Sequence, residues 1–262
     1  AGAITAQALG RGDRSLAQQL SGASLVLMTA TMGLAALVMF PFLPDLLQLL
    51  GASGYTAELA LRFSRIVLPS APLMGLGVCL SALLRSVGDA RRAMMVTLGA
   101  GVATALLDPL LIFGFGWGLD GAAIATFLAR LVMVGIGLYG VVHIHRLYVW
   151  PSASALRQTL QPFFSIGVPS VLTQVATPVG NAFVTESISA FGDNAVAGWA
   201  VVGRIIPVAF AALFALSGSV GPILGQNLGA GQHDRLRSTM HDSLKVVVCY
   251  VLCIWLLLAL SG

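Results

Sequence analysis

Two carboxylic acids lie inside long apolar stretches of this sequence, where a charge is costly. Asp108 lies deep in the apolar stretch 93–115, and Glu186 lies in the apolar stretch 162–191. An isolated charge at membrane depth costs from about 3 to over 10 kcal/mol. Burial also favours the neutral form of a carboxyl group. Asp108 therefore suits a group that takes up and releases a cation, although a polar lock between helices would use the same residue type.

The neighbours of Asp108 support a cation-binding role. Thr104 lies one turn earlier on the same face of the predicted helix. Pro109 cannot donate a backbone hydrogen bond, so one carbonyl of the preceding turn is left as a further oxygen ligand.

Glu186 and Asn181 form a second candidate site, for a substrate or a second cation. The alternative is that Glu186 lies near the outer end of its helix and faces water. Arg130 and Arg204 also fall within apolar stretches, and a buried arginine needs an anionic partner. Asp108 and Glu186 are the candidate partners.

The sequence gives little support for a metal site or for an enzyme active site. Cys79, Cys249 and Cys253 lie in apolar stretches, and no histidine or further cysteine completes a metal-ligand pattern beside them. No histidine lies at membrane depth, and neither a Gly-x-Ser-x-Gly nor a His-Glu-x-x-His motif occurs. We therefore expect no catalytic residues, no metal and no cofactor.

The elements that carry these residues are predicted to be membrane-spanning helices. Hydrophobic residues make up 57% of the 262 residues and charged residues only 9%, whereas soluble domains contain about 25% charged residues. A run of about 20 apolar residues crosses a bilayer as a helix. After a short helical tail ending at Leu9, we predict seven spans: 16–42, 59–84, 93–115, 121–143, 162–191, 196–228 and 244–260.

The connections between these spans alternate in charge. The first, third, fifth and seventh contain arginines, whereas the second, fourth and sixth contain acidic residues and no basic one. Short loops rich in Arg and Lys remain in the cytoplasm. The odd connections are therefore predicted to be cytoplasmic and the even ones external. We expect a multi-pass protein of the inner (cytoplasmic) membrane whose full-length N-terminus is cytoplasmic.

A repeated motif indicates a two-lobed protein. Gln-Ala-Leu-Gly-Arg-Gly at 7–12 recurs as Gln-Asn-Leu-Gly-Ala-Gly at 226–231, an offset of 226 − 7 = 219 residues. Transporters commonly consist of two such repeats. We predict an N-terminal lobe over 1–145, a cytoplasmic linker over 146–161 with a short surface helix at 154–160, and a C-terminal lobe over 162–262. The same offset predicts about one and a half helices before Ala1 and three after Gly262.

Several motifs, in order, resemble those of the multidrug and toxic-compound extrusion (MATE) family. They are Gln7–Asp13, Arg85–Asp89, Leu107–Gly114, Gly121–Thr126, Ile166–Ser170 and Gly225–Gly231. The resemblance covers nearly the whole chain and implies an all-α polytopic bundle, from the end of helix 2 to helix 9 of twelve, in two pseudo-symmetric six-helix lobes.

The resemblance also implies a function and a site. Members of the family are antiporters in which inward flow of H⁺ or Na⁺ expels amphipathic, often cationic, organic compounds. In the prokaryotic branch with an acidic N-lobe site, Asp108 and Thr126 match the cation-coupling residues. Thr104 stands where Asn is usual, which weakens a specific assignment to Na⁺, and the helix 1 Asp lies outside this chain.

We therefore expect a secondary active exporter, not an enzyme, that alternates access between two lobes. Its partners would be small organic substrates, a coupling cation and the lipid bilayer, with no nucleic acid, and the protein would be a monomer. The alternative is a lipid-linked oligosaccharide flippase of related fold. A flippase cavity that binds pyrophosphate should be basic, whereas the deep charges here are two acids and two arginines.

Overall fold

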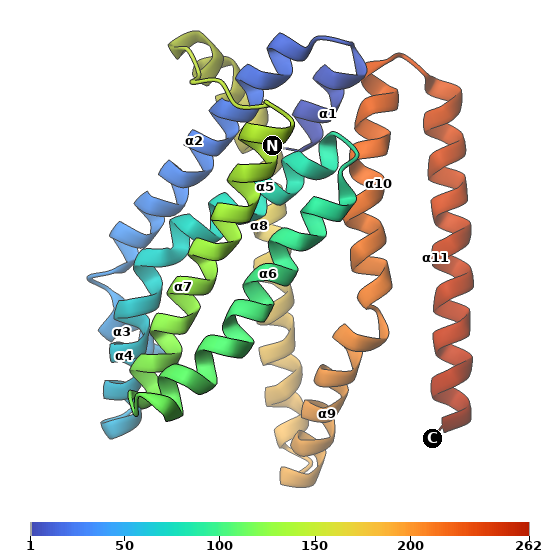
Figure 1. Ribbon diagram of the computed structural model, residues 1–262. Coiled ribbons are helices and arrows are strands. Elements are labelled where there is room, and N and C mark those ends of the chain that lie inside the picture. The colour runs from blue at the N-terminus through green and yellow to red at the C-terminus, as the bar shows by residue number, and fades with distance from the viewer. Residues whose placement is uncertain (1, 262) are drawn as a thin grey trace.

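The computed structural model describes residues 2–261, and every regular element within them is helical (Figure 1). The elements are α1 (Gly2–Gly10), α2 (Arg14–Met39), α3 (Leu43–Leu49), α4 (Gly54–Val67), η1 (Leu68–Ser70), α5 (Ala71–Ser86), α6 (Ala90–Pro109), η2 (Leu110–Gly114), α7 (Gly118–Leu138), η3 (Tyr139–Ile144), α8 (Ala153–Ser189), α9 (Asp193–Ala209), α10 (Ala211–Gly229) and α11 (His233–Ser261). The predicted all-α polytopic fold is confirmed.

Seven segments are long and apolar enough to span a membrane, as predicted. Six are continuous or nearly so: 14–39, 54–86, 90–114, 118–144, 153–189 and 233–260. The seventh is the pair α9 and α10, which are bent by 43° relative to each other.

The connections gather at two ends of the bundle according to their charge. The turns that join α1 to α2, α5 to α6, η3 to α8 and α10 to α11 all lie at the top of Figure 1, and we call this the basic end. The turns that join α2 to α4, η2 to α7 and α8 to α9 lie at the opposite, acidic end (Figure 1). The connections that alternate in charge along the sequence thus lie at opposite ends of the bundle in the structure.

The core lies in the N-terminal bundle, where small residues bring helices close together. Leu80, Leu83 and Leu84 of α5 are fully buried. A Cβ atom at Gly137 of α7 would lie 2.8 Å from that of Leu80. Close approach through glycine is the usual packing device of membrane helices, which lack a hydrophobic driving force between them.

The methionines of the same bundle contact glycines. Met28 and Met32 of α2 contact the backbone at Gly75, and Met133 of α7 contacts it at Gly77. These methionines pack the core, since a flexible thioether fills the space that a glycine leaves.

The predicted surface helix at 154–160 is wrong, because these residues form the first turns of α8. The Ser152 hydroxyl accepts a hydrogen bond from the Ala155 amide at 3.2 Å and caps the helix. Ala155 and Thr159 are buried, and α8 packs against α2. Pro162 lies inside the helix without ending it. Burial of these turns against the N-terminal bundle makes them part of one long helix.

The predicted single span 196–228 is bent at Phe210. Pro207 interrupts the hydrogen bonding of the last turn of α9. The Tyr250 hydroxyl of α11 donates to the Ala209 carbonyl at 2.7 Å, where the helix breaks. A side chain from the neighbouring helix thus satisfies a carbonyl that the bend exposes.

The segment 145–151, which we call the strap, lies along α2 and is hydrogen-bonded to it. Arg14 donates a hydrogen bond to the His145 carbonyl at 2.9 Å, and Gln18 donates to the Arg146 carbonyl at 2.7 Å. Leu147 is 1% exposed, and the Val149 carbonyl rests directly on Gly22. The first part of the predicted linker 146–161 therefore packs with the N-terminal bundle, and its second part begins α8.

Candidate functional site

Asp108 lies in the last turn of α6, where the helix changes character. Pro109 follows it, and the chain continues as the π-helical turn η2. Its Oδ1 atom is buried and has no hydrogen-bond partner among the described residues. A buried polar atom without a partner costs about 1–3 kcal/mol. Asp108 is thus a carboxyl group available to a bound cation or proton.

Thr126 lies at the same level of the bundle as Asp108. Gly121 of α7 lies against the Leu111 carbonyl, and Gly99 of α6 lies against Ile136. This antiparallel register places Asp108 opposite residues 124–127. The Thr126 hydroxyl donates to the Ala122 carbonyl at 2.9 Å, and that of Thr104 donates to the Ala100 carbonyl at 3.0 Å. Both oxygens keep a lone pair free to bind a cation.

No ion pair joins Arg130 to an acid among the described residues, which corrects the prediction from the sequence. Its guanidinium donates to the Ser70 hydroxyl at 2.5 Å and to the Val67 carbonyl at 3.2 Å. Within the 3₁₀ turn η1, the Ser70 hydroxyl also donates to the same Val67 carbonyl, at 2.7 Å. Arg130 thus links α7 to the 3₁₀ turn that lies between α4 and α5 in the neighbouring span.

The second candidate site is not assembled within the described residues. Glu186 and Asn181 both lie on α8 and are exposed, and Glu186 is in the last turn before the acidic end. Arg204 of α9 is exposed and lines a cavity with Ile254 and Leu257 of α11. No ion pair joins Arg204 to another residue within 2–261. Glu186 therefore lies exposed near the end of its helix.

Two ion-pair clusters were not predicted. At the acidic end, Arg62 of α4 bonds to Asp120 of α7, whose other carboxylate oxygen is buried without a partner among the described residues. At the basic end, Asp89 bonds to Arg92 at 2.5 Å and to His145 at 2.6 Å. The sequence signal for the second cluster was an acid and bases in connections at the same predicted end, whereas Arg62 lay inside the predicted span 59–84.

Asp89 is held in its charged form by this cluster. Burial alone would raise the pKa of Asp89, but hydrogen bonds from His145 and from the side chain and backbone of Arg92 lower that pKa to about 2. The carboxylate also caps α6 by accepting a hydrogen bond from the Arg92 amide at 3.0 Å. The cluster therefore joins the α5–α6 turn to the segment strapped onto α2.

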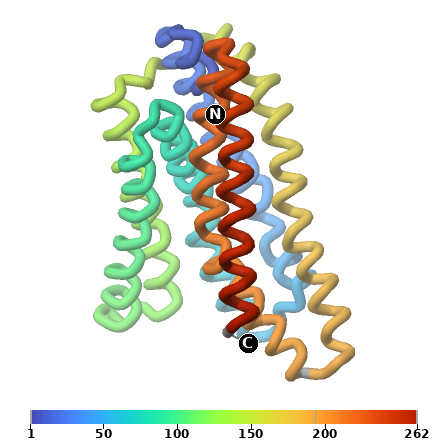
Figure 2. Tube along the Cα trace, turned by 90° about the vertical axis from the view of Figure 1, so that its right-hand side faces the viewer, coloured from blue at the N-terminus to red at the C-terminus, as the bar shows by residue number. Residues whose placement is uncertain are grey.

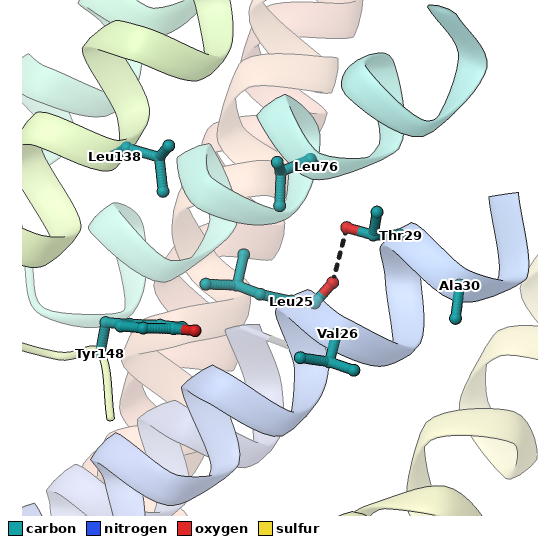
Figure 3. A pocket seen from close by; sticks show the side chains of 7 residues that line it. All are labelled: Leu25, Val26, Thr29, Ala30, Leu76, Leu138 and Tyr148. Atoms are coloured by element: carbon teal, nitrogen blue, oxygen red, sulfur yellow. Dashed lines mark hydrogen bonds between the residues drawn. The ribbon is translucent and has the colours of Figure 1, made fainter. Parts of the chain in front are cut away.

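A cavity of about 430 Å³ has walls from α2, α5 and α7 (Figure 3), and Asp108 is not among its lining residues. Leu25 and Val26 of α2, Leu76 of α5 and Tyr148 contribute to its wall. The Thr29 hydroxyl in this wall is already bonded to the Leu25 carbonyl at 2.8 Å (Figure 3). The cavity therefore offers little to a polar ligand.

A smaller cavity, of about 250 Å³, lies between the N-terminal bundle and α8. It is lined by residues of α1, α2, α5 and α8, among them Ile4, Met28, Cys79 and Phe163. Cys79 is 4% exposed. This cavity is lined by residues of both predicted lobes, 1–145 and 162–262.

Comparison with known proteins identifies related sequences and structures. The sequence profile of the MatE family matches residues 1–110 and 169–262. A FAD transporter of Shewanella oneidensis is 31% identical over 83% of this chain and 50% of its own length. The multidrug export protein MepA of Staphylococcus aureus is 25% identical over 95% of this chain and 54% of its own length.

Solved structures are similar over nearly the whole chain. The bent form of the Vibrio cholerae MATE transporter VcmN has a TM-score of 0.87 at 28% identity, covering 98% of this chain and 58% of VcmN. A mutant of the same transporter has a TM-score of 0.90 at 30% identity, with the same coverage. The chain thus spans about half the length of the curated relatives that it matches, and these relatives are named as transporters and exporters.

Proposed function

The chain belongs to the MatE family, and on that premise we propose that it is the central part of a secondary active exporter of amphipathic organic compounds. Export would be driven by exchange for H⁺ or Na⁺, with two lobes that open alternately to the two sides of the membrane. The matches to MepA and VcmN support this proposal, since one is a multidrug exporter and the other a MATE transporter.

Asp108 is the residue on which the coupling proposal rests. Its Oδ1 atom is buried without a partner among the described residues, and the register of α6 and α7 places Thr126 at its level. An uncompensated charge inside an apolar span is costly, so a carboxyl group there would bind a cation or a proton. Alternation between those two states is what an antiporter requires, and Thr104 and Thr126 would supply further oxygen ligands.

Replacement of Asp108 tests the coupling. Asp108→Asn keeps the shape of the side chain and removes its titration, so we expect loss of dye efflux with normal insertion and folding. Asp108→Glu should retain partial activity with a shifted pH optimum. The measurement is dye efflux in everted vesicles that contain the full-length protein, with a proton gradient and a sodium gradient imposed separately. Wild-type efflux by Asp108→Asn would make Asp108 a structural polar lock.

The same proposal includes the setting of the protein. The basic end would face the cytoplasm, because arginine-rich connections are retained there, and the membrane would be the inner membrane of the cell. We propose a monomer, with each chain carrying its own pair of lobes.

Arg85 favours a second candidate, an exporter of anionic dinucleotides. The guanidinium of Arg85 donates to the Ser81 hydroxyl, one turn deeper in α5, at 2.9 Å. Its Nε atom lies 3.9 Å from the Cβ position of Gly218 in α10. Arg85 has no acidic partner among the described residues. A guanidinium at the meeting of the two lobes suits a phosphate group, and the similar Shewanella oneidensis protein is named a FAD transporter.

Substitution of Arg85 separates the two candidates. If the substrate is anionic, Arg85→Gln should lower FAD export about tenfold or more, since a hydrogen bond to a charged group contributes about 1.5–3 kcal/mol. Arg85→Lys should restore part of it, and export of a cationic dye should not change. Arg91→Gln is the matched control, because Arg91 is exposed at the same end. Absence of FAD export by the wild type would exclude this candidate.

A further inference from the structure

The two copies of the repeated motif contact each other across the molecule. Gly10 of α1 lies on the backbone of Gln226 in α10, and Gly229 of α10 lies on the backbone of Gln7 in α1. A methyl group on either glycine would overlap the glutamine carbonyl oxygen and lie 2.8 Å from its carbonyl carbon. The distances are the same in both directions. The contact is therefore reciprocal, as it is at a two-fold axis.

The residue pairs obey the sequence offset of the repeat. The offsets are 229 − 10 = 219 and 226 − 7 = 219 residues. Gly225 faces Ala6, with 2.9 Å between its Cβ position and the Cβ atom of Ala6, and 225 − 6 is also 219. Gly225 and Ala6 are thus equivalent positions that meet on the axis. The pseudo-symmetry of the two halves passes through this crossing.

The crossing joins the two halves at the basic end. The cavity that contains Cys79 is lined by Gly2 and Ile4, which precede Gly10 on α1 and so lie on the membrane side of the crossing. A hydrogen bond also spans the halves here, from the Gln226 side-chain amide to the Ser86 carbonyl at 2.6 Å. In Figure 2, α10 and α11 lie toward the viewer, with α6 and α7 seen to one side and α8 to the other.

We propose that the crossing of α1 and α10 is the cytoplasmic gate of the exporter. This inference rests on the proposed function, because a gate matters only in a protein that opens alternately. Backbone contacts backbone at the crossing, so the helices separate without unpacking large side chains. Any side chain at Gly10 or Gly229 prevents closure, because packed interfaces tolerate almost no added volume. The Gln226–Ser86 hydrogen bond breaks when the gate opens.

Alanine substitutions test the gate, with Cys79 as the reporter. In full-length protein that carries Cys249→Ala and Cys253→Ala, an impermeant thiol reagent is added to the cytoplasmic side of everted vesicles. Gly10→Ala and Gly229→Ala should each label Cys79 at least severalfold faster than the parent, and to the same extent. Gly221→Ala is the matched control, because a Cβ atom there meets nothing within 4 Å. Unchanged labelling in both variants, with wild-type thermal stability, would overturn the proposal.

A covalent bridge tests whether the crossing must open. Ala6→Cys and Gly225→Cys are combined in a background without the native cysteines. Their Cβ atoms are closer than the 3.5–4.5 Å of an ordinary disulfide, so the helices need only part slightly to form one. Oxidation should stop export and reduction should restore it. Export by the oxidised protein, or failure of the pair to oxidise, would contradict the gate.

The two experiments distinguish failure of the gate from failure of the proposed function. Labelling of Cys79 requires no substrate and no ion gradient. If the wild type exports nothing but labelling still responds to Gly10→Ala and Gly229→Ala, the crossing opens in a protein of another function. If export is normal and labelling does not respond, the exporter stands and the gate lies elsewhere.

Discussion

Asp13 and Asp89 occupy the same local position but have different partners. Each follows a glycine with positive φ, Gly12 or Gly88, and each caps the helix that begins next. Asp89 also bonds to Arg92 and His145, whereas no ion pair joins Asp13 to another residue of the described range. Comparison of Asp13 with Asp89 therefore separates the contribution of a helix cap to stability from the contribution of an ion-pair cluster.

Replacement of Asp89 by Asn should therefore lower stability by about 1.5–3 kcal/mol at neutral pH, because hydrogen bonds to a charged group are lost. Asn caps a helix about as well as Asp, so Asp13→Asn should change stability by less than about 0.5 kcal/mol. Thermal unfolding of the purified protein in detergent measures both. Equal effects of the two substitutions would contradict the account of the cluster.

The pH dependence of this difference follows from the lowered pKa of Asp89. The folded pKa is about 2 against an ordinary value of 3.8. A depressed carboxyl pKa stabilises the folded state above the unfolded value, and this contribution is lost as the pH falls from about 4 to about 2. The stability difference between wild type and Asp89→Asn should shrink over that window. A difference that grows on acidification would contradict the assignment.

At the scale of elements, the close approach of η2 to α7 passes through Gly121. A Cβ atom at Gly121 would lie 2.7 Å from the Leu111 carbonyl oxygen. Gly121→Ala must push α7 away from η2, so we expect a loss of about 1–3 kcal/mol, typical of overpacking. Gly135→Ala in the same helix is the control, since its Cβ atom would meet nothing within 4 Å. Thermal unfolding that ranks the two variants equally would refute this.

The spans could be predicted from the sequence, whereas their breaks could not. An apolar run long enough to cross a bilayer must be helical wherever it sits, so 93–115 and 121–143 needed no tertiary information. The bend at Phe210 and the 3₁₀ turn at Leu68–Ser70 have tertiary partners: Tyr250 donates to the Ala209 carbonyl, and Arg130 donates to the Ser70 hydroxyl and the Val67 carbonyl. Composition does not reveal such partners.

The candidate site was predictable to a similar degree. The cost of a charge in an apolar stretch singled out Asp108, and the structure describes its orphaned oxygen. The expected pairing of Arg130 with an acid was wrong, because its partners among the described residues are the Val67 carbonyl and the Ser70 hydroxyl. The Asp89 cluster escaped prediction because Asp89 and His145 are 56 residues apart and meet only in the folded bundle.

At the scale of the whole molecule, the segregation of charge between the two ends predicts the orientation in the membrane. Cysteine at position 45, in an exposed acidic position, should react with an impermeant thiol reagent outside intact cells. Cysteines at positions 91 and 235, exposed at the basic end, should stay protected until the cells are opened. Labelling of positions 91 and 235 in intact cells would show that the orientation is opposite to the predicted one.

The strap of residues 145–151 across α2 has a consequence for biosynthesis. Every partner of the strap, from Arg14 and Gln18 to Gly22, is made before the strap itself. Domains of a growing chain fold in order as the ribosome releases them. The N-terminal bundle can therefore fasten its last connection once position 149 has emerged. Helix α8 and the helices that follow it can then pack against an N-terminal bundle that has already formed.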